Sequence, residues 1–326
     1  MHGIGSNDRS RLSTRGTTQV VTTGQGERLK HALSEANGSL LRVRVPLTCG
    51  ELIQGTLGGT PVLVSAPIGI YSRVQLEASE GLQLPPDALK MRHALEGAGA
   101  VNVRICVQRG ARCGAGYATS TADIVGGLAL WGGWRGVPFA PDELARRAVA
   151  IEPSDGIMWP GLTLFAQRDA SIIEPLGSAP PLPLLLLDPG GTVDTVRWTR
   201  RLPHLSLDHS TQKALNDLRY GLTSADVAAI GRAASISAKA YQPLLPSALV
   251  EQALQLAPTV GALGVVRAHS GPIVGLLFAN QTDAQTAWPI VKQIFPTCDM
   301  RLTMLTDGGV SLGAIPCGCP GLRLPT

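Results

Sequence analysis

Alternating apolar and polar residues dominate the chain between residues 40 and 107. The alternation is regular in LLRVRVP, residues 40–46, and in VNVRICV, residues 101–107, and an apolar-rich run, PVLVSAPIGIYSRVQLEA, occupies residues 61–78. Successive side chains of a β-strand point to opposite faces, so this spacing predicts strands separated by Gly and Pro turns. The ordered part of the protein is therefore expected to begin near residue 40 with a β-rich region.

Helical spacing replaces the alternation further along the chain. Ile124, Val125, Leu128 and Trp131 recur at helical intervals and form an apolar stripe that could pack on a sheet. The segment PDELARRAVAIE, residues 141–152, predicts a second helix, because proline is tolerated in the first turn. The middle of the chain is therefore expected to be helical.

The second half mixes helices and strands. LPLLLLD, residues 182–188, predicts a buried strand, since a membrane span needs ~20 apolar residues. Further helices are expected near residues 208–220, 224–240, 246–257 and 282–294, and further strands in GALGVVRA, in PIVGLLFAN and near residues 299–305. This mixture of elements predicts two α+β domains.

Domain limits follow from composition. Residues 1–38 are polar and lack periodicity, which predicts a mobile N-terminal tail. The segment PLGSAPPLPLLLLDPGG is rich in Pro and Gly, and we expect the domain boundary there. The predicted domains are residues 39–180 and residues 181–326.

Composition and charge narrow the function. The chain of 326 residues has 28 Lys and Arg, 24 Asp and Glu, and a net charge of +4, with only 4% aromatic residues. A nucleic-acid groove normally needs a basic surface and stacking platforms, so a small acidic ligand is the better expectation. There is no apolar segment typical of a secretory signal, and six cysteines are too few for a disulfide scaffold. We therefore expect a cytoplasmic protein with reduced cysteines and neither nucleic-acid nor membrane partners.

The segment GAGYATSTAD, residues 114–123, carries the clearest chemistry. Gly114 and Gly116 allow close approach of a ligand to the main chain, and amides at the start of a helix favour an anion. Hydroxyl groups follow at residues 119–121. The segment has neither the lysine of a Walker A loop nor the third glycine of a dinucleotide fingerprint. It could be another kind of phosphate loop, or Ser120 and Asp123 could simply form a capping box.

This loop resembles the second motif of the GHMP kinases, and more specifically that of their L-threonine kinase branch, which is associated with cobalamin synthesis and propanediol utilisation. Four further segments resemble that branch in the expected order, over roughly residues 40–310. They are CGELIQG (49–55), EPSDGIMWPG (152–161), GGTVDT (190–195) and AHSGPIVGLLF (268–278). The resemblance implies an α+β, two-domain GHMP kinase fold, with a ribosomal protein S5 domain 2-like N-terminal domain and a ferredoxin-like C-terminal domain.

The resemblance also implies an ATP-dependent kinase that phosphorylates the hydroxyl of L-threonine, to give O-phospho-L-threonine for cobalamin biosynthesis. Asp155 falls where these kinases carry the aspartate beside the acceptor hydroxyl, although PSDG is also a favourable β-turn. Magnesium prefers oxygen ligands, and Ser120 and Glu152 are the candidates. The phosphate-binding residues would be Gly114, Ala115, Gly116, Tyr117, Ala118, Thr119, Ser120 and Thr121. Thr119 stands where serine is common, which keeps the hydroxyl.

The acceptor pocket is expected near two other segments. Glu51 could bind the ammonium of an amino-acid acceptor, or it could be an exposed loop carboxylate. His269, Ser270 and Gly271 would form the third motif, which closes against the site, although a plain turn between strands has the same pattern and Pro272 reduces the number of amides. Arg197 is one candidate for the acceptor carboxylate, or part of a solvated basic cluster.

Other interpretations remain open. The acceptor could be L-serine, homoserine or another short amino alcohol, and a catalytically silent nucleotide-binding regulator would keep the same fold. Cys317 and Cys319 could bind a metal, but a structural zinc site usually needs four close ligands and no second Cys or His pair is nearby. The sequence does not set the oligomeric state.

Overall fold

The computed structural model describes residues 40–191 and 207–315. The predicted tail, the basic cluster at Arg197, most of GGTVDT, and Cys317 and Cys319 lie outside the described residues. The four cysteines within them, Cys49, Cys106, Cys113 and Cys298, are free.

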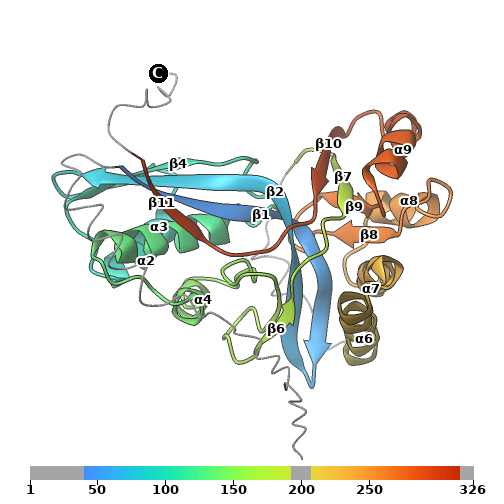
Figure 1. Cartoon of the computed structure of the whole chain (residues 1–326), viewed down its shortest axis with the longest axis horizontal. Coiled ribbons are helices and arrows are strands. Elements are labelled where there is room, and N and C mark those ends of the chain that lie inside the picture. The colour runs from blue at the N-terminus through green and yellow to red at the C-terminus, as the bar shows by residue number, and fades with distance from the viewer. Residues whose placement is uncertain (1–39, 192–206, 316–326) are drawn as a thin grey trace, which may run out of the picture.

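A long antiparallel hairpin organises the sheet (Figure 1). Strands β1 (Leu40–Leu57) and β2 (Thr60–Ala78) form it, and Gly58 and Gly59 make its turn with positive φ angles. The described strands join in one eleven-stranded sheet whose main path is β10-β7-β9-β8-β1-β2-β4-β3. The other strands are β3 (Leu82–Gln83), β4 (Val103–Gln108), β5 (Leu162–Phe165), β6 (Ile173–Gly177), β7 (Pro183–Asp188), β8 (Gly264–Arg267), β9 (Val274–Leu277), β10 (Asp299–Met304) and β11 (Ser311–Ile315).

Helices pack against this sheet in two groups. One group lies with the first half of the chain, where α3 packs on β1 and β2; the other lies near β1 and the strands of the second half (Figure 1). The described helices are α2 (Leu89–Gly97), α3 (Thr119–Trp134), α4 (Pro141–Val149), α6 (Asp208–Ser224), α7 (Val227–Ala240), α8 (Ala248–Leu256) and α9 (Gln281–Ile294). None of them is both long and apolar enough to cross a membrane.

Helix α3 is a core helix rather than a surface helix. Most of its residues are buried, including the predicted stripe. Two glycines allow its close packing, since a Cβ at Gly126 would lie 2.7 Å from Val74 Cγ2 and one at Gly127 would lie 2.8 Å from Met91 Cγ. The tight packing fixes the start of this helix against β1 and β2.

The predicted strands and helices are confirmed, with two kinds of correction. Helix α4 ends at Val149 rather than at residue 152, since Pro153 disfavours helical backbone before it. Short elements were missed: α2, β3, β5, β6 and β11. Strand β11 pairs with the first five residues of β1, so the C-terminal strand returns to the N-terminal half. The domain limits remain a prediction.

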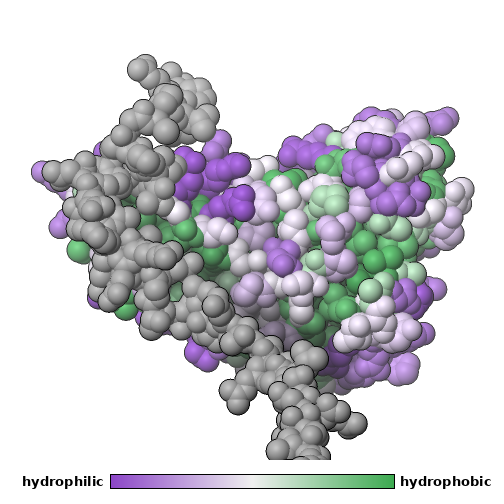
Figure 2. All heavy atoms as spheres, viewed as in Figure 1, coloured by the Kyte–Doolittle hydropathy of each residue, from purple (hydrophilic) through white to green (hydrophobic). Residues whose placement is uncertain are grey.

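Hydrophilic and hydrophobic residues are interspersed over the face in Figure 2, and neither kind covers it alone. Six large apolar side chains are among the exposed described residues, and they are spread over several elements: Leu89, Val101, Val137, Tyr220, Ile290 and Ile294.

Candidate active site

A cavity of about 440 Å³ lies at the start of α3. Its walls come from β1, β2, α2, the loop before α3, the loop after α4 and the turn between β8 and β9. Most of the predicted site residues line it, namely Glu51, Gly114, Gly116, Tyr117, Ala118, Thr119, Ser120, Thr121, Glu152, Asp155 and Ser270. Ala115, His269 and Gly271 do not line it: Ala115 and His269 are buried, and Gly271 packs against the loop.

The glycine loop is fixed to β1 through its carbonyl groups. Thr48 N–H donates to Tyr117 O at 3.1 Å, and Gly50 N–H donates to Gly116 O at 3.2 Å. The carbonyl and amide of a trans peptide point in opposite directions, so the N–H groups of Tyr117 and Ala118 point away from β1. Both residues line the cavity. The loop is therefore held in an orientation suited to an anion.

No side chain caps the start of α3, so the predicted alternative of a capping box is wrong. Ala118 precedes the helix in a left-handed conformation with φ of 59°, and no side-chain cap hydrogen bond is made. Ser120 donates instead to Glu152, and Asp123 forms an ion pair with Arg109 at 2.6 Å. The first amides of the helix, which a cap would satisfy, are available to a ligand.

Two consecutive hydroxyls of α3 bind the loop after α4. Ser120 Oγ donates to Glu152 Oε1, and Thr121 Oγ1 accepts from the Asp155 N–H at 3.1 Å. The two predicted metal ligands, Ser120 and Glu152, are thus brought together. Asp155 lies beside them rather than in a solvated turn, which removes the simple β-turn interpretation.

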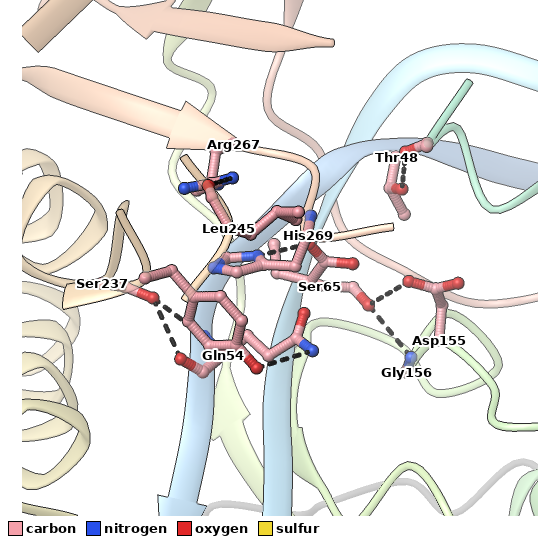
Figure 3. A network of polar contacts seen from close by, with 12 residues as sticks. Thr48, Gln54, Ser65, Asp155, Gly156, Ser237, Leu245, Arg267 and His269 are labelled. Carbon is pink, nitrogen blue, oxygen red and sulfur yellow. Dashed lines mark hydrogen bonds and ion pairs between the residues drawn. The ribbon is translucent and has the colours of Figure 1, made fainter. Parts of the chain in front are cut away.

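Asp155 lies in a polar but poorly solvated position (Figure 3). Ser65 Oγ donates to Asp155 Oδ1 at 3.4 Å and accepts from Gly156 N–H at 3.0 Å. Burial raises the pKa of Asp155 to about 8, and the charge of Glu51 also raises it, while the hydrogen bond from Thr121 has the opposite effect. A carboxylate with such a pKa is a stronger base than an ordinary one, and its ionised form can accept a proton from a substrate hydroxyl.

Glu51 is buried and not an exposed loop carboxylate. It lies opposite Ser65 in the β1–β2 register and opposite Arg267 where β1 meets β8. Its Oε2 accepts from the His269 N–H at 3.0 Å and lies 2.8 Å from His269 Nδ1. Burial raises the pKa of Glu51 to about 7, and the His269 N–H and the charge of Arg267 partly offset this.

His269 supports Glu51 from outside the cavity. Burial, and then the charge of Arg267, lower the pKa of His269 well below its ordinary value, so the imidazole is neutral at pH 7. Its Nδ1–H donates to the ionised form of Glu51, and its ring packs edge-on against Tyr241 at 4.2 Å between centroids. Arg267 in turn donates to Gln242 Oε1 at 3.0 Å. It also donates to the Leu245 carbonyl at 3.0 Å (Figure 3).

The turn between β8 and β9 lies against the glycine loop. A Cβ at Gly271 would lie 2.2 Å from the Ala115 carbonyl, and one at Gly116 would lie 2.3 Å from Ala268 Cβ. Ser270 reaches the cavity from this turn. The two loops were predicted to meet, and glycine is needed at both contact points.

The sequence interpretation missed several residues at this site. Ser65 belongs to a strand whose register with Glu51 was unknown. Lys90 and Arg109 also line the cavity, and Lys90 binds Glu152. Met91, Ala94 and Leu95 are the buried residues of α2, and their spacing could have revealed that helix and hence Lys90.

Comparison with solved structures identifies the fold. No family model matches the chain. Homoserine kinase from Cytophaga hutchinsonii superposes with a TM-score of 0.68 and 20% identity, over 86% of this chain and 98% of that one. The fold is that of the GHMP kinases, so the predicted α+β GHMP fold is confirmed.

Curated relatives define the family more narrowly. L-threonine kinase from Citrobacter freundii is 31% identical over 281 residues, which are 82% of this chain and 98% of the relative. L-threonine kinase from Salmonella typhimurium is 31% identical over 243 residues, which are 71% of this chain and 81% of the relative. The chain belongs to the L-threonine kinase family. The expected class of enzyme, a phosphotransferase with an alcohol group as acceptor, is confirmed.

Proposed function

We propose that the protein transfers the terminal phosphoryl group of ATP to the hydroxyl of L-threonine, giving O-phospho-L-threonine and ADP. The observation that carries the proposal is the meeting of Asp155 and Glu51 in one cavity beside the uncapped start of α3. One carboxylate can serve the hydroxyl of an amino alcohol and the other its ammonium. The membership of the L-threonine kinase family supports this acceptor.

The nucleotide phosphates bind the loop of residues 114–121. The carbonyls of Gly116 and Tyr117 accept hydrogen bonds from β1, and the amides at the start of α3 together with the helix dipole favour negative charge. Ser120 and Glu152 are two adjacent oxygen donors, a set that fits Mg²⁺, which usually takes its remaining ligands from phosphate and water. The metal would neutralise charge on the phosphates.

The acceptor binds with its hydroxyl at Asp155 and its ammonium at the free oxygen of Glu51. Hydroxyl and ammonium are on adjacent carbons in L-threonine, so the two carboxylates that bind them must be close. Glu51 raises the pKa of Asp155 through its charge, and Ser65 lies opposite Glu51 in the sheet while donating to Asp155. An ammonium at this position compensates the charge of both carboxylates.

Asp155 positions the hydroxyl and takes its proton as the reaction proceeds. The hydroxyl oxygen forms a bond to the terminal phosphorus, the bond from that phosphorus to the bridging oxygen breaks, and ADP leaves with the electron pair. The transition state of such transfers is loose, so positioning contributes beside proton removal. His269 keeps Glu51 oriented through two hydrogen bonds.

The test is an acceptor panel with purified protein, ATP and Mg²⁺. L-Threonine, L-serine and L-homoserine are compared by ADP release, and the phosphorylated product is identified by ³¹P NMR. We expect the highest kcat/KM with L-threonine. A preference for L-serine or L-homoserine would make that compound the acceptor in place of L-threonine. If no short amino alcohol were phosphorylated, a nucleotide-binding regulator would be the better interpretation. We also propose that the enzyme works in the cytoplasm and that its product enters cobalamin biosynthesis.

A further inference from the structure

The ammonium of Lys90 pairs with Glu152, one of the two candidate metal ligands. Lys90 is the second residue of α2, and its Nζ donates to Glu152 Oε2, while Ser120 donates to the other oxygen of the same carboxylate. Both oxygens of Glu152 are thus already bound, one by a cation. The Lys90 side chain is 48% exposed and that of Glu152 is 17% exposed, so the ammonium lies at the open side of the pair.

The charges around the cavity give this lysine a particular importance. Among the described residues, the cavity is lined by five carboxylates and two cations, Lys90 and Arg109. Arg109 binds Asp87 and Asp123, with Nη1 2.8 Å from Asp87 and Nη2 2.6 Å from Asp123. Lys90 has one ion-pair partner. It is therefore the cation that can change partners at the lowest cost when a polyphosphate enters.

The position of Lys90 in its helix has no structural advantage of its own. A cation in the first turn of a helix lies at the positive end of the helix dipole, which is unfavourable. Helix α2 has no acidic residue in its first turn and no side-chain cap to compensate. The bond to Glu152 offsets that cost, and a phosphate group would do so when nucleotide is bound.

We propose that Lys90 is a phosphate-binding residue that exchanges partners: it neutralises Glu152 before nucleotide binds, and it binds a phosphate oxygen of the nucleotide once Glu152 takes up the metal. The inference rests on the nucleotide half of the proposed function and is independent of the acceptor. A lysine suits this role because it is a compact charge on a flexible stem. At the phosphates its charge would stabilise the transferring group.

The first test measures nucleotide binding by isothermal titration calorimetry, without acceptor. Lys90→Met keeps the length of the side chain and removes its charge. We expect MgATP to bind about 10- to 100-fold more weakly, the range of a charge-assisted hydrogen bond, and adenosine to bind within twofold of the wild type. Arg92→Met is the matched control, because Arg92 is a cation of the same helix that pairs with Glu96 and does not line the cavity.

The second test measures Mn²⁺ alone, by electron paramagnetic resonance. Removal of the ammonium frees one oxygen of Glu152, so Lys90→Met is expected to bind Mn²⁺ more tightly than the wild type and Arg92→Met to match it. Opposite effects on Mn²⁺ and MgATP distinguish an exchanging lysine from a structural one. Lys90→Gln serves as a second uncharged variant if Lys90→Met does not fold.

Unchanged MgATP affinity in the folded variants would overturn the proposal, as would an equal loss for adenosine, which would indicate a damaged pocket. Unchanged or weaker Mn²⁺ binding would overturn the exchange. Failure of the acceptor panel would sink the threonine assignment and leave these binding measurements intact, because no acceptor is present in them.

Discussion

Glu51 and His269 are 218 positions apart in the sequence, and two hydrogen bonds from His269 converge on one oxygen of the Glu51 carboxylate. The bonds come from the main-chain N–H and from Nδ1, and the imidazole is neutral because burial lowers its pKa. The orientation of Glu51 is therefore set by the turn between β8 and β9, while Glu51 itself belongs to β1. The other oxygen is left to the cavity, where the proposed ammonium binds.

The first prediction concerns that oxygen. Glu51→Gln keeps the size of the side chain and removes its charge, so we expect the KM for L-threonine to rise about 10- to 100-fold, the effect of losing one charge-assisted hydrogen bond. The KM for ATP should change little. Steady-state kinetics with each substrate varied in turn provides the measurement.

Two comparisons sharpen this prediction. Glu77→Gln removes a half-exposed carboxylate of β2 that pairs with Arg104 and does not line the cavity, and it should behave like the wild type. 3-Hydroxybutyrate, which has the hydroxyl but lacks the ammonium, should be an equally poor acceptor for the wild type and for Glu51→Gln. If Glu51→Gln lowered kcat/KM by a similar factor for L-threonine and for 3-hydroxybutyrate, Glu51 would not bind the ammonium.

The second prediction concerns the contact between the two loops. Gly116 has φ of +94°, and a Cβ there would collide with Ala268 Cβ at 2.3 Å. Gly116→Ala should therefore shift the glycine loop and weaken ATP binding at least about tenfold by calorimetry. Gly59→Ala imposes a similar backbone strain, with φ of +80°, where a Cβ meets nothing within 4 Å. If both variants bind ATP equally well, the loop contact does not shape the nucleotide site.

The third prediction concerns the proposed metal ligands. Ser120→Ala and Glu152→Gln each remove one oxygen donor or its charge, so both should raise the Mg²⁺ concentration that gives half-maximal turnover. The measurement is a Mg²⁺ titration at fixed ATP. Wild-type Mg²⁺ dependence in both variants would remove these residues from the metal shell.

The strands and helices could be predicted from the sequence because the apolar periodicity of each one lies within one continuous segment. The glycine loop could be identified for the same reason, since its residues are contiguous. Ser65 and Lys90 were missed because their roles depend on partners far along the chain. The Ser65–Glu51 register depends on bulges in β1, and the Lys90–Glu152 pair joins residues 62 positions apart.

Two local interpretations failed for a related reason. Ser120 and Asp123 have the spacing of a capping box, but Glu152 and Arg109 bind them instead. Glu51 follows two small residues and a glycine, a context typical of an exposed loop, yet a bulged strand buries it where β1 meets β8. In both cases the conformation depends on tertiary contacts with residues far along the chain, and a single sequence does not show which residues make those contacts.

The fourth prediction concerns the pH dependence of catalysis. Asp155 has a pKa raised to about 8 and Glu51 has one raised to about 7, so both carboxyl groups are mostly protonated at pH 6. A protonated Asp155 cannot accept the hydroxyl proton, and a protonated Glu51 attracts the ammonium less. We expect kcat/KM for L-threonine to rise between pH 6 and about 8. Bound cations favour the ionised forms, so the rise in kcat should occur at lower pH. A profile flat over this range would contradict the assignment.

The last prediction separates the catalytic cost of Asp155 from its structural cost. Asp155→Asn keeps the size of the side chain and removes its basicity. Turnover should fall about 10²- to 10⁴-fold, the usual contribution of a general base, and ATP affinity should change little. Near-normal turnover would remove Asp155 from the catalytic step.

The stability of Asp155→Asn relative to the wild type should rise, while its turnover falls, and the pH should determine the size of the gain. The pKa of Asp155 is raised to about 8 in the folded protein and is about 3.9 in an unfolded chain. Its favourable contribution is therefore complete below about pH 4 and is lost as the pH rises through about 8. Asparagine has no such loss, so Asp155→Asn should melt at the same temperature as the wild type near pH 4 and at least about 2 °C higher near pH 8.5.

Asp169→Asn is the control, because Ser171 lowers the pKa of that exposed carboxyl. Its melting temperature relative to the wild type should therefore change with pH in the opposite direction. Melting curves without ligand that show the same difference at both pH values would mean that Asp155 is ionised throughout, and the proposed proton acceptor would then lack the raised pKa on which its role depends.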